Sequence, residues 1–204
     1  MVLFQQQIGA SLDDTYTVSG GATENHPTDV DAMFGHYYTS TKSGTINYYY
    51  NSFLRFLLDI PVGSIINSAY LTLHASGSRI DDFIAQINYT NEDDAADFST
   101  NPTGRADATT DVAWAVPDFT ACQNVQTVDI TSLIQHFLNR AGYNANNHIA
   151  IKIKRGDAYL EWQRFYQWDY NPAYAAILIV NYTPPGVPPA GYQFSNGLVC
   201  VQVK

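Results

Sequence analysis

The strongest constraint on this chain is its rhythm of short apolar runs, most of them five to nine residues long and separated by Gly, Pro, Asn or Asp. Runs of this length that are rich in β-branched and aromatic residues predict strands rather than helices. We expect strands at residues 2–8, 14–18, 37–38, 46–50, 52–60, 65–74, 83–89, 112–116, 125–130, 147–154, 161–166 and 175–182. Clusters of turn-forming residues predict long loops at 19–35 and 90–110.

One segment has helical periodicity instead. Its apolar residues share one helical face, and they are Leu133, Ile134, Phe137 and Leu138. Thr131 is placed to cap the N-terminus of this helix and Gly142 to end it. Because a parallel α/β fold needs helices between its strands, the pattern predicts an all-β protein, a jelly-roll-like antiparallel β-sandwich with one short helix.

Composition changes after residue 183, where a Pro- and Gly-rich stretch begins. We therefore expect a β-sandwich domain at 1–183, followed at 184–204 by a semi-rigid linker and a C-terminal arm that contains a strand. The apolar residues of the arm are Tyr192, Phe194, Leu198, Val199, Val201 and Val203. Such an arm offers a strand edge to a neighbouring chain, and packing on its own domain is an equal alternative.

Charge and composition exclude several classes of protein. The chain has 19 acidic against 10 basic residues and a net charge of −9, which argues against nucleic acid as a partner. No apolar run approaches the roughly 18 residues of a membrane span, so we expect no membrane insertion. The first residues lack the features of a signal peptide, so we expect synthesis in a cytoplasm. Cys122 and Cys200 are expected to be two ordinary thiols.

Four stretches together resemble the DNRLRE-type (disaggregatase-related) β-sandwich domains. They are the opening DDTY at 13–16, the segment LRF-x3-IP-x-G-x2-I-x-SA-x-L-x-L at 54–73, VDIT-x-LIQ at 128–135, and RFY through ILIVNY at 164–182. The second stretch is the most specific. The closing strand departs from the family pattern, because residues 173–176 replace the usual immediate Pro-x-Leu.

The resemblance implies a jelly-roll-like sandwich over about residues 12–183, without implying a function. Relatives of this kind occur in extracellular carbohydrate-binding and cell-wall proteins and in virion proteins of tailed bacteriophages. Residues 109–114 and 135–142 are most similar to the phage-associated members. Within the sandwich, Arg55 is expected on a central strand, where it needs acid or carbonyl partners if it is buried, and Asp14 and Asp169 are the candidate acids.

No catalytic pattern is present. The five histidines are scattered and lie in no HExxH or GxSxG frame. Acids that are adjacent on a strand, such as Asp13 and Asp14, point to opposite faces and do not form a glycosidase pair. We therefore expect that the chain is not an enzyme.

Two binding sites are considered. The densest group of oxygen ligands lies in the loop at 90–110, where calcium is a candidate cofactor with Asn91, Glu92, Asp93, Asp94 and Asp97 as ligands. A solvated acidic loop is the alternative. Two groups of aromatic residues are candidates for a glycan-binding platform: the run Tyr48, Tyr49 and Tyr50, and a group of one strand parity, namely Trp162, Tyr166, Trp168 and Tyr170. A core position for these rings is the alternative.

The interpretation that unites these features is a non-enzymatic structural protein on the exterior of a tailed-phage virion, as a capsid decoration, fibre or neck-associated subunit. Its expected partners are other virion proteins and further copies of itself, with host-surface polysaccharide as a second partner. A free carbohydrate-binding module of an extracellular system is the alternative.

Overall fold

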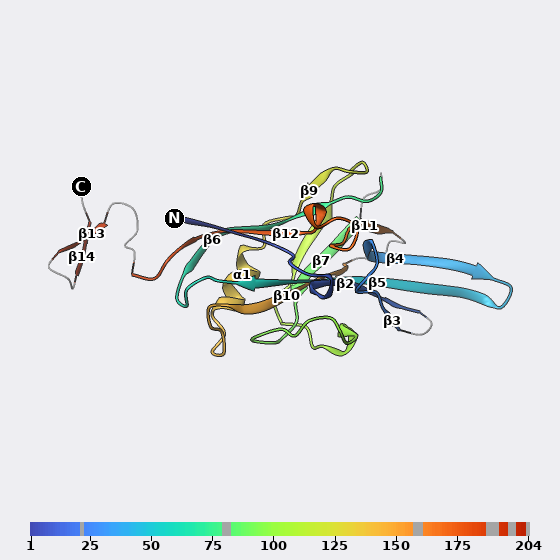
Figure 1. Ribbon diagram of the computed structural model, residues 1–204, viewed down its shortest axis with the longest axis horizontal. Coiled ribbons are helices and arrows are strands. Elements are labelled where there is room, and N and C mark those ends of the chain that lie inside the picture. The colour runs from blue at the N-terminus through green and yellow to red at the C-terminus, as the bar shows by residue number, and fades with distance from the viewer. Residues whose placement is uncertain (21–22, 79–82, 157–160, 187–191, 196–198, 203–204) are drawn as a thin grey trace.

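In the computed structural model the chain is an all-β sandwich with one short helix (Figure 1). The structure describes all residues except 21–22, 79–82, 157–160, 187–191, 196–198 and 203–204. The strands are β1 (Val2–Gln7), β2 (Asp14–Ser19), β3 (Glu24–Asn25), β4 (Asp31–Thr41), β5 (Gly44–Leu58), β6 (Ile65–His74), β7 (Phe83–Tyr89), β8 (Val112–Val116), β9 (Asn124–Gln126), β10 (Asn147–Arg155), β11 (Trp162–Tyr166), β12 (Ile177–Thr183), β13 (Tyr192–Ser195) and β14 (Val199–Gln202). The helix is α1 (Thr131–Leu138), and short 3-10 turns lie at Ser11–Asp13, Pro102–Gly104 and Pro172–Tyr174.

Two antiparallel sheets face each other. The smaller sheet has the order β1-β12-β6-β9. The larger sheet has the order β11-β4-β5-β10-β7-β8, and β2 pairs with β5 and with the short β3. Every one of these pairs is antiparallel, as the alternating sequence pattern predicts.

The main core fills the space between the sheets. Alternate residues of each strand point inward, as in β12, where Leu178 and Val180 are fully buried while Ile177 and Ile179 are half-exposed. The inward face of α1 packs on β6 with the four residues that the periodicity predicts, Leu133, Ile134, Phe137 and Leu138. The expected fold class is therefore confirmed.

The ends of the helix differ from the prediction. The Thr131 hydroxyl makes no capping bond, and the Thr131 amide instead donates to the Asp129 carboxylate at 2.7 Å. The helix ends at Leu138, before Gly142, and the amide of Asn139 donates to the carbonyl of Gln135. An acid two residues before the helix has taken the role that the pattern assigned to Thr131.

A second, smaller core lies on the outer side of the larger sheet. The loop at 90–110 covers this side and buries Phe53, Ala95, Phe98 and Ala150 together. The Arg105 guanidinium holds the loop closed through the carbonyls of Ala96 and Asp97. The long loop is therefore fixed to the sheet by its own small core.

The largest difference from the expected strands is at residues 31–58. The predicted loop at 19–35 contains β3 and the start of β4, and the predicted strands at 46–50 and 52–60 merge into the single long strand β5. By contrast, the strand predicted at 125–130 is shorter in the structure, where only β9 (Asn124–Gln126) forms. Within the described residues, no helix is long and apolar enough to cross a membrane.

Candidate binding surfaces

The four aromatic residues predicted to form one platform are divided by the end of β11. Trp162 and Tyr166 share one face of the strand, but Trp168 and Tyr170 lie in the turn that follows it, where strand alternation no longer applies. Trp162 lies beside Tyr50, with ring centroids 6.1 Å apart, and Trp168 packs half-buried against the main core. Only Tyr166 and Tyr170 come together, as stacked rings 3.8 Å apart.

Two rings that the sequence did not single out join this pair. Tyr174 lies 5.7 Å from Tyr166 and 6.0 Å from Tyr170, and the imidazole of His74 stacks on Tyr174 at 4.1 Å. We call these four residues (His74, Tyr166, Tyr170 and Tyr174) the tyrosine cluster. Tyr170 is exposed and the other three are half-exposed. A hydrogen bond with Tyr170 raises the pKa of the Tyr166 phenol to about 12, so this phenol is neutral at physiological pH.

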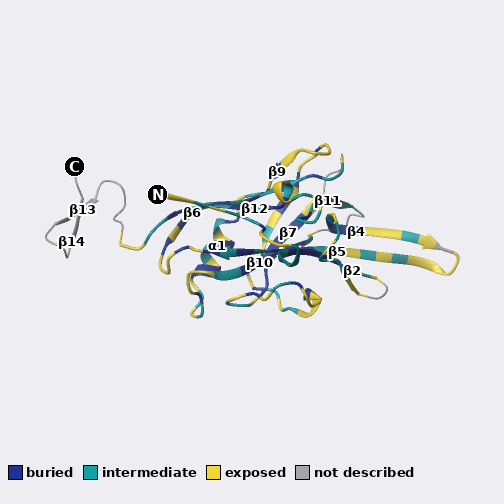
Figure 2. Ribbon diagram, viewed as in Figure 1, coloured by how far each residue is buried: buried dark blue, intermediate teal, exposed yellow. Residues whose placement is uncertain are grey.

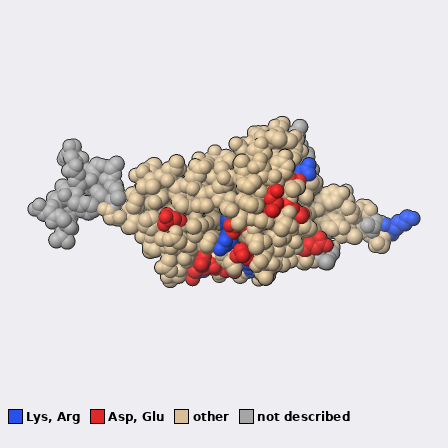
Figure 3. Space-filling model, viewed as in Figure 1, with Lys and Arg blue, Asp and Glu red and all other residues tan. Residues whose placement is uncertain are grey.

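The tyrosine cluster adjoins the outer face of the smaller sheet, which it meets at His74 in β6. Strand register and alternation place the following residues on that face: Leu3, Gln5, Gln7, Ile65, Ser68, Tyr70, Thr72, Asn124, Gln126, Ile177, Ile179, Asn181 and Thr183. None of them is charged, and the part of the surface over β6 and β12 that is visible in Figure 3 is tan. Amide and hydroxyl groups beside aromatic rings are the groups that bind neutral sugars.

The acidic side chains of the loop at 90–110 are bound by neighbouring protein groups. Each of the four carboxylates proposed as calcium ligands has a different partner: Glu92 contacts Arg105, Asp93 contacts Arg140, Asp94 contacts His148 and Asp97 contacts Ser99. The Asn91 side-chain oxygen also accepts from Arg140, at 2.6 Å. Across the described ranges, no three His, Cys, Asp or Glu side chains gather as metal ligands would. Calcium binding stays a prediction to which this geometry adds no support.

Two neighbouring acids, Asp13 and Asp14, have opposite environments. Asp13 accepts from Arg55 at 2.5 Å, and Arg55 also donates to the carbonyl of Ala95. The partner of Arg55 is therefore Asp13, and the expectation of Asp14 or Asp169 was wrong. Asp14 is fully buried and accepts from the amide of Trp168 at 2.9 Å, while its other oxygen has no protein partner. Burial, reinforced by the nearby charge of Asp169, raises the pKa of Asp14 to about 8.

A hollow of about 350 Å³ opens beside Tyr16, at the ends of β2 and β4. The Tyr16 hydroxyl donates to Asp29 at 3.0 Å, and the His26 ring stacks on Tyr16 and lies 3.1 Å from the same carboxylate. Burial, and then the hydrogen bond to Asp29, raise the pKa of Tyr16 above its ordinary value. No sequence pattern indicated this group, because Tyr16 lies in β2 while His26 and Asp29 lie in the segment between β3 and β4.

The β4–β5 ribbon, residues 36–49, projects from one end of the sandwich (Figure 1). Pairing of β11 with β4 stops at Gly35, and pairing of β2 with β5 starts at Tyr49. Between these points, within the described strands, the two strands of the ribbon pair only with each other. Beyond His36, the described residues of the ribbon are half-exposed or exposed, as Figure 2 shows, in contrast to the buried residues that fill the body.

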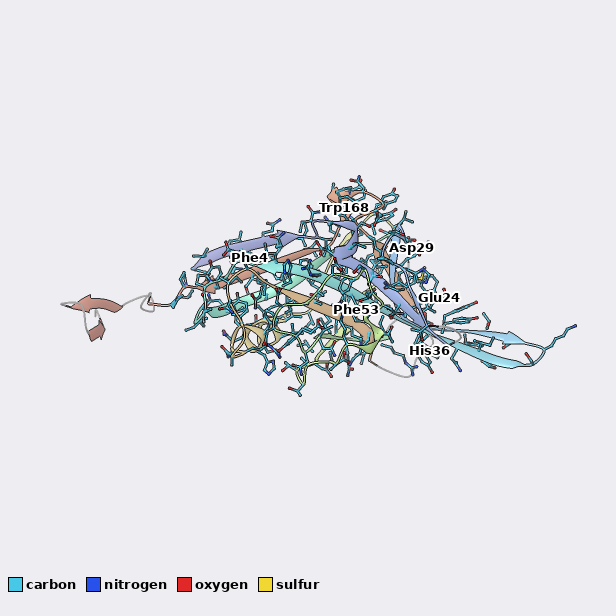
Figure 4. All side chains as sticks on the ribbon, turned by 60° about the horizontal axis from the view of Figure 1, so that its bottom comes forward. Phe4, Glu24, Asp29, His36, Phe53 and Trp168 are labelled. Carbon is cyan, nitrogen blue, oxygen red and sulfur yellow. The ribbon has the colours of Figure 1, made fainter. Side chains whose placement is uncertain are left out.

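Gly35 marks the base of the ribbon. Its φ of +119° is open to glycine and rarely to other residues, and a Cβ there would lie 2.3 Å from the carbonyl oxygen of Glu161. Just beyond it, His36 lies where the ribbon leaves the body (Figure 4). His36 is buried, lies 3.1 Å from the side-chain oxygen of Asn47 and stacks on Tyr49. The base of the ribbon is therefore held by contacts with the body, whereas the rest of the ribbon is exposed to solvent.

The predicted C-terminal arm forms a hairpin instead of a single strand. β13 pairs with β14, with Tyr192 opposite Gln202 and Phe194 opposite Cys200. Val199 and Val201 lie within β14, while Leu198 and Val203 lie outside the described residues. In the described part of the chain, the hairpin is a sheet of two strands separate from both sheets of the sandwich.

A scan against protein-family models finds no match for this chain, and a search of curated proteins finds no match either.

Proposed function

We propose that this chain is a non-enzymatic structural protein on the exterior of a tailed-phage virion, as a capsid decoration, fibre or neck-associated subunit. The observation that carries the proposal is the β4–β5 ribbon. It contributes little to the core of its own domain, yet it exposes Tyr37, Tyr38 and Tyr49 to solvent by 43%, 42% and 39%. Exposed tyrosines on a preformed β-ribbon are typical of a surface that is buried in an assembly.

The arrangement of polar groups agrees with a structural role. The five histidines lie in separate places: His26 is beside Asp29, His36 beside Asn47, His74 beside Asn124, His136 beside Tyr89 and His148 beside Asp94. Buried polar groups hold loops and strand ends, as Arg55 does with Asp13 and Ala95. The sequence resemblance to phage-associated β-sandwich domains supports the same proposal.

The direct test is quantitative mass spectrometry of purified virus particles, counting copies of this chain per particle. We expect a fixed, reproducible number. A number in the hundreds identifies a capsid decoration, and about a dozen identifies a neck, fibre or tail part. Finding the chain only outside the particles would contradict the proposal.

A second role, contact with host-surface glycan, is favoured by the tyrosine cluster beside an uncharged sheet face. The same observation supports the alternative function, a free carbohydrate-binding module. We expect Tyr170→Ala to weaken binding to polysaccharide extracted from the host surface by roughly fivefold, because each stacked ring contributes about 1 kcal/mol. Tyr38→Ala, which removes an exposed ring on the distant ribbon, is the matched control. Equal binding by both variants would exclude the tyrosine cluster as the glycan site.

A further inference from the structure

One face of the β4–β5 ribbon continues the inner face of the sandwich beyond the end of the core. Residues of β5 alternate, so Ile46, Tyr48, Tyr50 and Leu54 share a face. Leu54 is buried in the main core and Tyr50 packs against it, but Tyr48 and Ile46 extend past it. The smaller sheet, which covers Leu54, does not reach them in the described structure (Figure 1).

Residues of β4 lie beside Ile46 and Tyr48 on the same uncovered face of the ribbon. Register places Tyr37 opposite Tyr48 and Thr39 opposite Ile46, and the rings of Tyr37 and Tyr48 lie 6.4 Å apart. We call Tyr37, Thr39, Ile46 and Tyr48 the ribbon face. It is apolar and hydroxyl-rich, and in residues 36–49 Lys42 at the tip is the one Lys, Arg, Asp or Glu. A β-face of this composition is suited to packing against another uncharged β-element.

The chain carries such an element in its C-terminal hairpin. Residues 192–203 contain no Asp, Glu, Lys or Arg, and their apolar members include Phe194, Val199 and Val201. A hairpin of two four-residue strands is at best marginally stable alone in water, so it needs a surface to pack on. In a chain of net charge −9, two uncharged surfaces can meet without repulsion.

The structure places the hairpin away from the ribbon face of its own chain. The linker starts after Thr183, which pairs with Ile65 at the end of the sandwich opposite the ribbon. β13 and β14 lie beyond that end, with the length of the sandwich between them and the ribbon (Figure 1). A second copy can bring its hairpin to the ribbon face without this separation.

We infer that the ribbon face of one copy is covered by the C-terminal hairpin of a second copy. The contact joins two different surfaces, so it is head-to-tail, and repetition of it builds a ring or a linear row of subunits. This inference rests on the proposed function in so far as both require assembly. Its test needs no virus particle, so it can fail or succeed independently of the count of copies per particle.

The experiment measures the molar mass of the purified full chain by light scattering over a range of concentrations. We expect the wild-type chain to form oligomers. Ile46→Asp, which places a charge on the ribbon face, should reduce the mass to that of one chain, 22.7 kDa. Thr45→Asp places the same charge on the opposite face of the ribbon, where Thr45 is exposed, and should leave the oligomer intact. Phe194→Asp should also give single chains.

Mixing the two defective variants tests the head-to-tail pairing itself. The Ile46→Asp chain keeps an intact hairpin and the Phe194→Asp chain keeps an intact ribbon, so together they should form a dimer of twice the single-chain mass. Thermal melting of each variant checks that the sandwich is folded. A monomeric wild-type chain, equal effects of Ile46→Asp and Thr45→Asp, or a mixture that stays monomeric would each overturn the inference.

Discussion

Strands β4 and β5 run from the body of the sandwich into the β4–β5 ribbon, and these two regions are stabilised in different ways. In the body, β5 contributes Leu54, Phe56 and Leu58 to a core that is sealed on both sides. In the ribbon, the same strand has one partner and both of its faces meet solvent. The body therefore provides the stability of the fold, while the ribbon is a surface that the fold holds in place.

Removing a large ring from the body should have the largest effect. Phe56 is 1% exposed, and Phe56→Ala leaves a cavity between the two sheets. We expect the free energy of unfolding to fall by about 3–5 kcal/mol. Chemical denaturation monitored by fluorescence measures this loss. A loss below about 1 kcal/mol would mean that the body is not the source of stability.

Breaking the ion pair that holds the outer loop should have the next largest effect. Arg55→Ala leaves the mostly buried Asp13 carboxylate without its 2.5 Å partner and the carbonyl of Ala95 without its donor. We expect a loss of about 2–3 kcal/mol, because a partly buried charge is left unpaired. Hydrogen exchange should rise in the loop at 90–110 and stay unchanged in the ribbon. Equal exchange in both regions would contradict the local role of Arg55.

A buried acid in the body should make stability depend on pH. The folded-state pKa of Asp14, about 8, lies above the ordinary value of 3.8. Between these values the folded chain keeps a proton that the unfolded chain releases, so the contribution of Asp14 to stability decreases as the pH rises from about 4 to 8. The slope is at most about 1.4 kcal/mol per pH unit.

Asp14→Asn should remove this slope, and Asp118→Asn, at an exposed loop position, should leave it unchanged. Denaturation curves at several pH values compare the three proteins. If the wild-type chain and Asp14→Asn showed the same slope, Asp14 would be ionised in the folded state.

The smallest effect on stability is expected in the ribbon. Tyr48 is half-exposed and contacts Tyr37 across the ribbon. We expect Tyr48→Ala to change the free energy of unfolding of the isolated chain by about 0.5 kcal/mol or less, as for other surface positions. The same denaturation measurement as for Phe56→Ala checks this. A loss comparable to that of Phe56→Ala would remove the distinction between the two regions.

The body could be predicted from the sequence, whereas only the inner ends of the ribbon, at 37–38 and 46–50, were expected as strands, for a physical reason. Burial imposes alternation on strands such as β6 and a single apolar face on α1, and both patterns were visible. The ribbon has no buried face, so the Thr, Ser, Gly and Asn of residues 39–47 resemble a loop. Only its backbone pairing shows that it is a pair of strands.

The candidate sites depend on contacts between distant segments, which local patterns do not contain. Alternation along a strand predicted that Trp162 and Tyr170 share one face. However, β11 ends at Tyr166, and the turn that follows it separates the two rings. His74 and Tyr174 reach the tyrosine cluster from β6 and from a 3-10 turn, more than 90 residues apart. Similarly, Arg55 selects Asp13 over its neighbour Asp14, a choice set by which carboxylate faces the outer side of the sheet.

Gly35 can help to identify, from sequence, other β-sandwich proteins that carry such a ribbon. A side chain at this position would collide with the backbone of Glu161 and Trp162, at the start of the paired strand β11. The ribbon and β11 can therefore both form only if this position is glycine. In a relative whose sequence has otherwise diverged, a glycine between a buried aromatic residue and a His-Tyr-Tyr-like run would mark where the ribbon leaves the body. A bulky residue there would indicate a sandwich whose end is closed in another way.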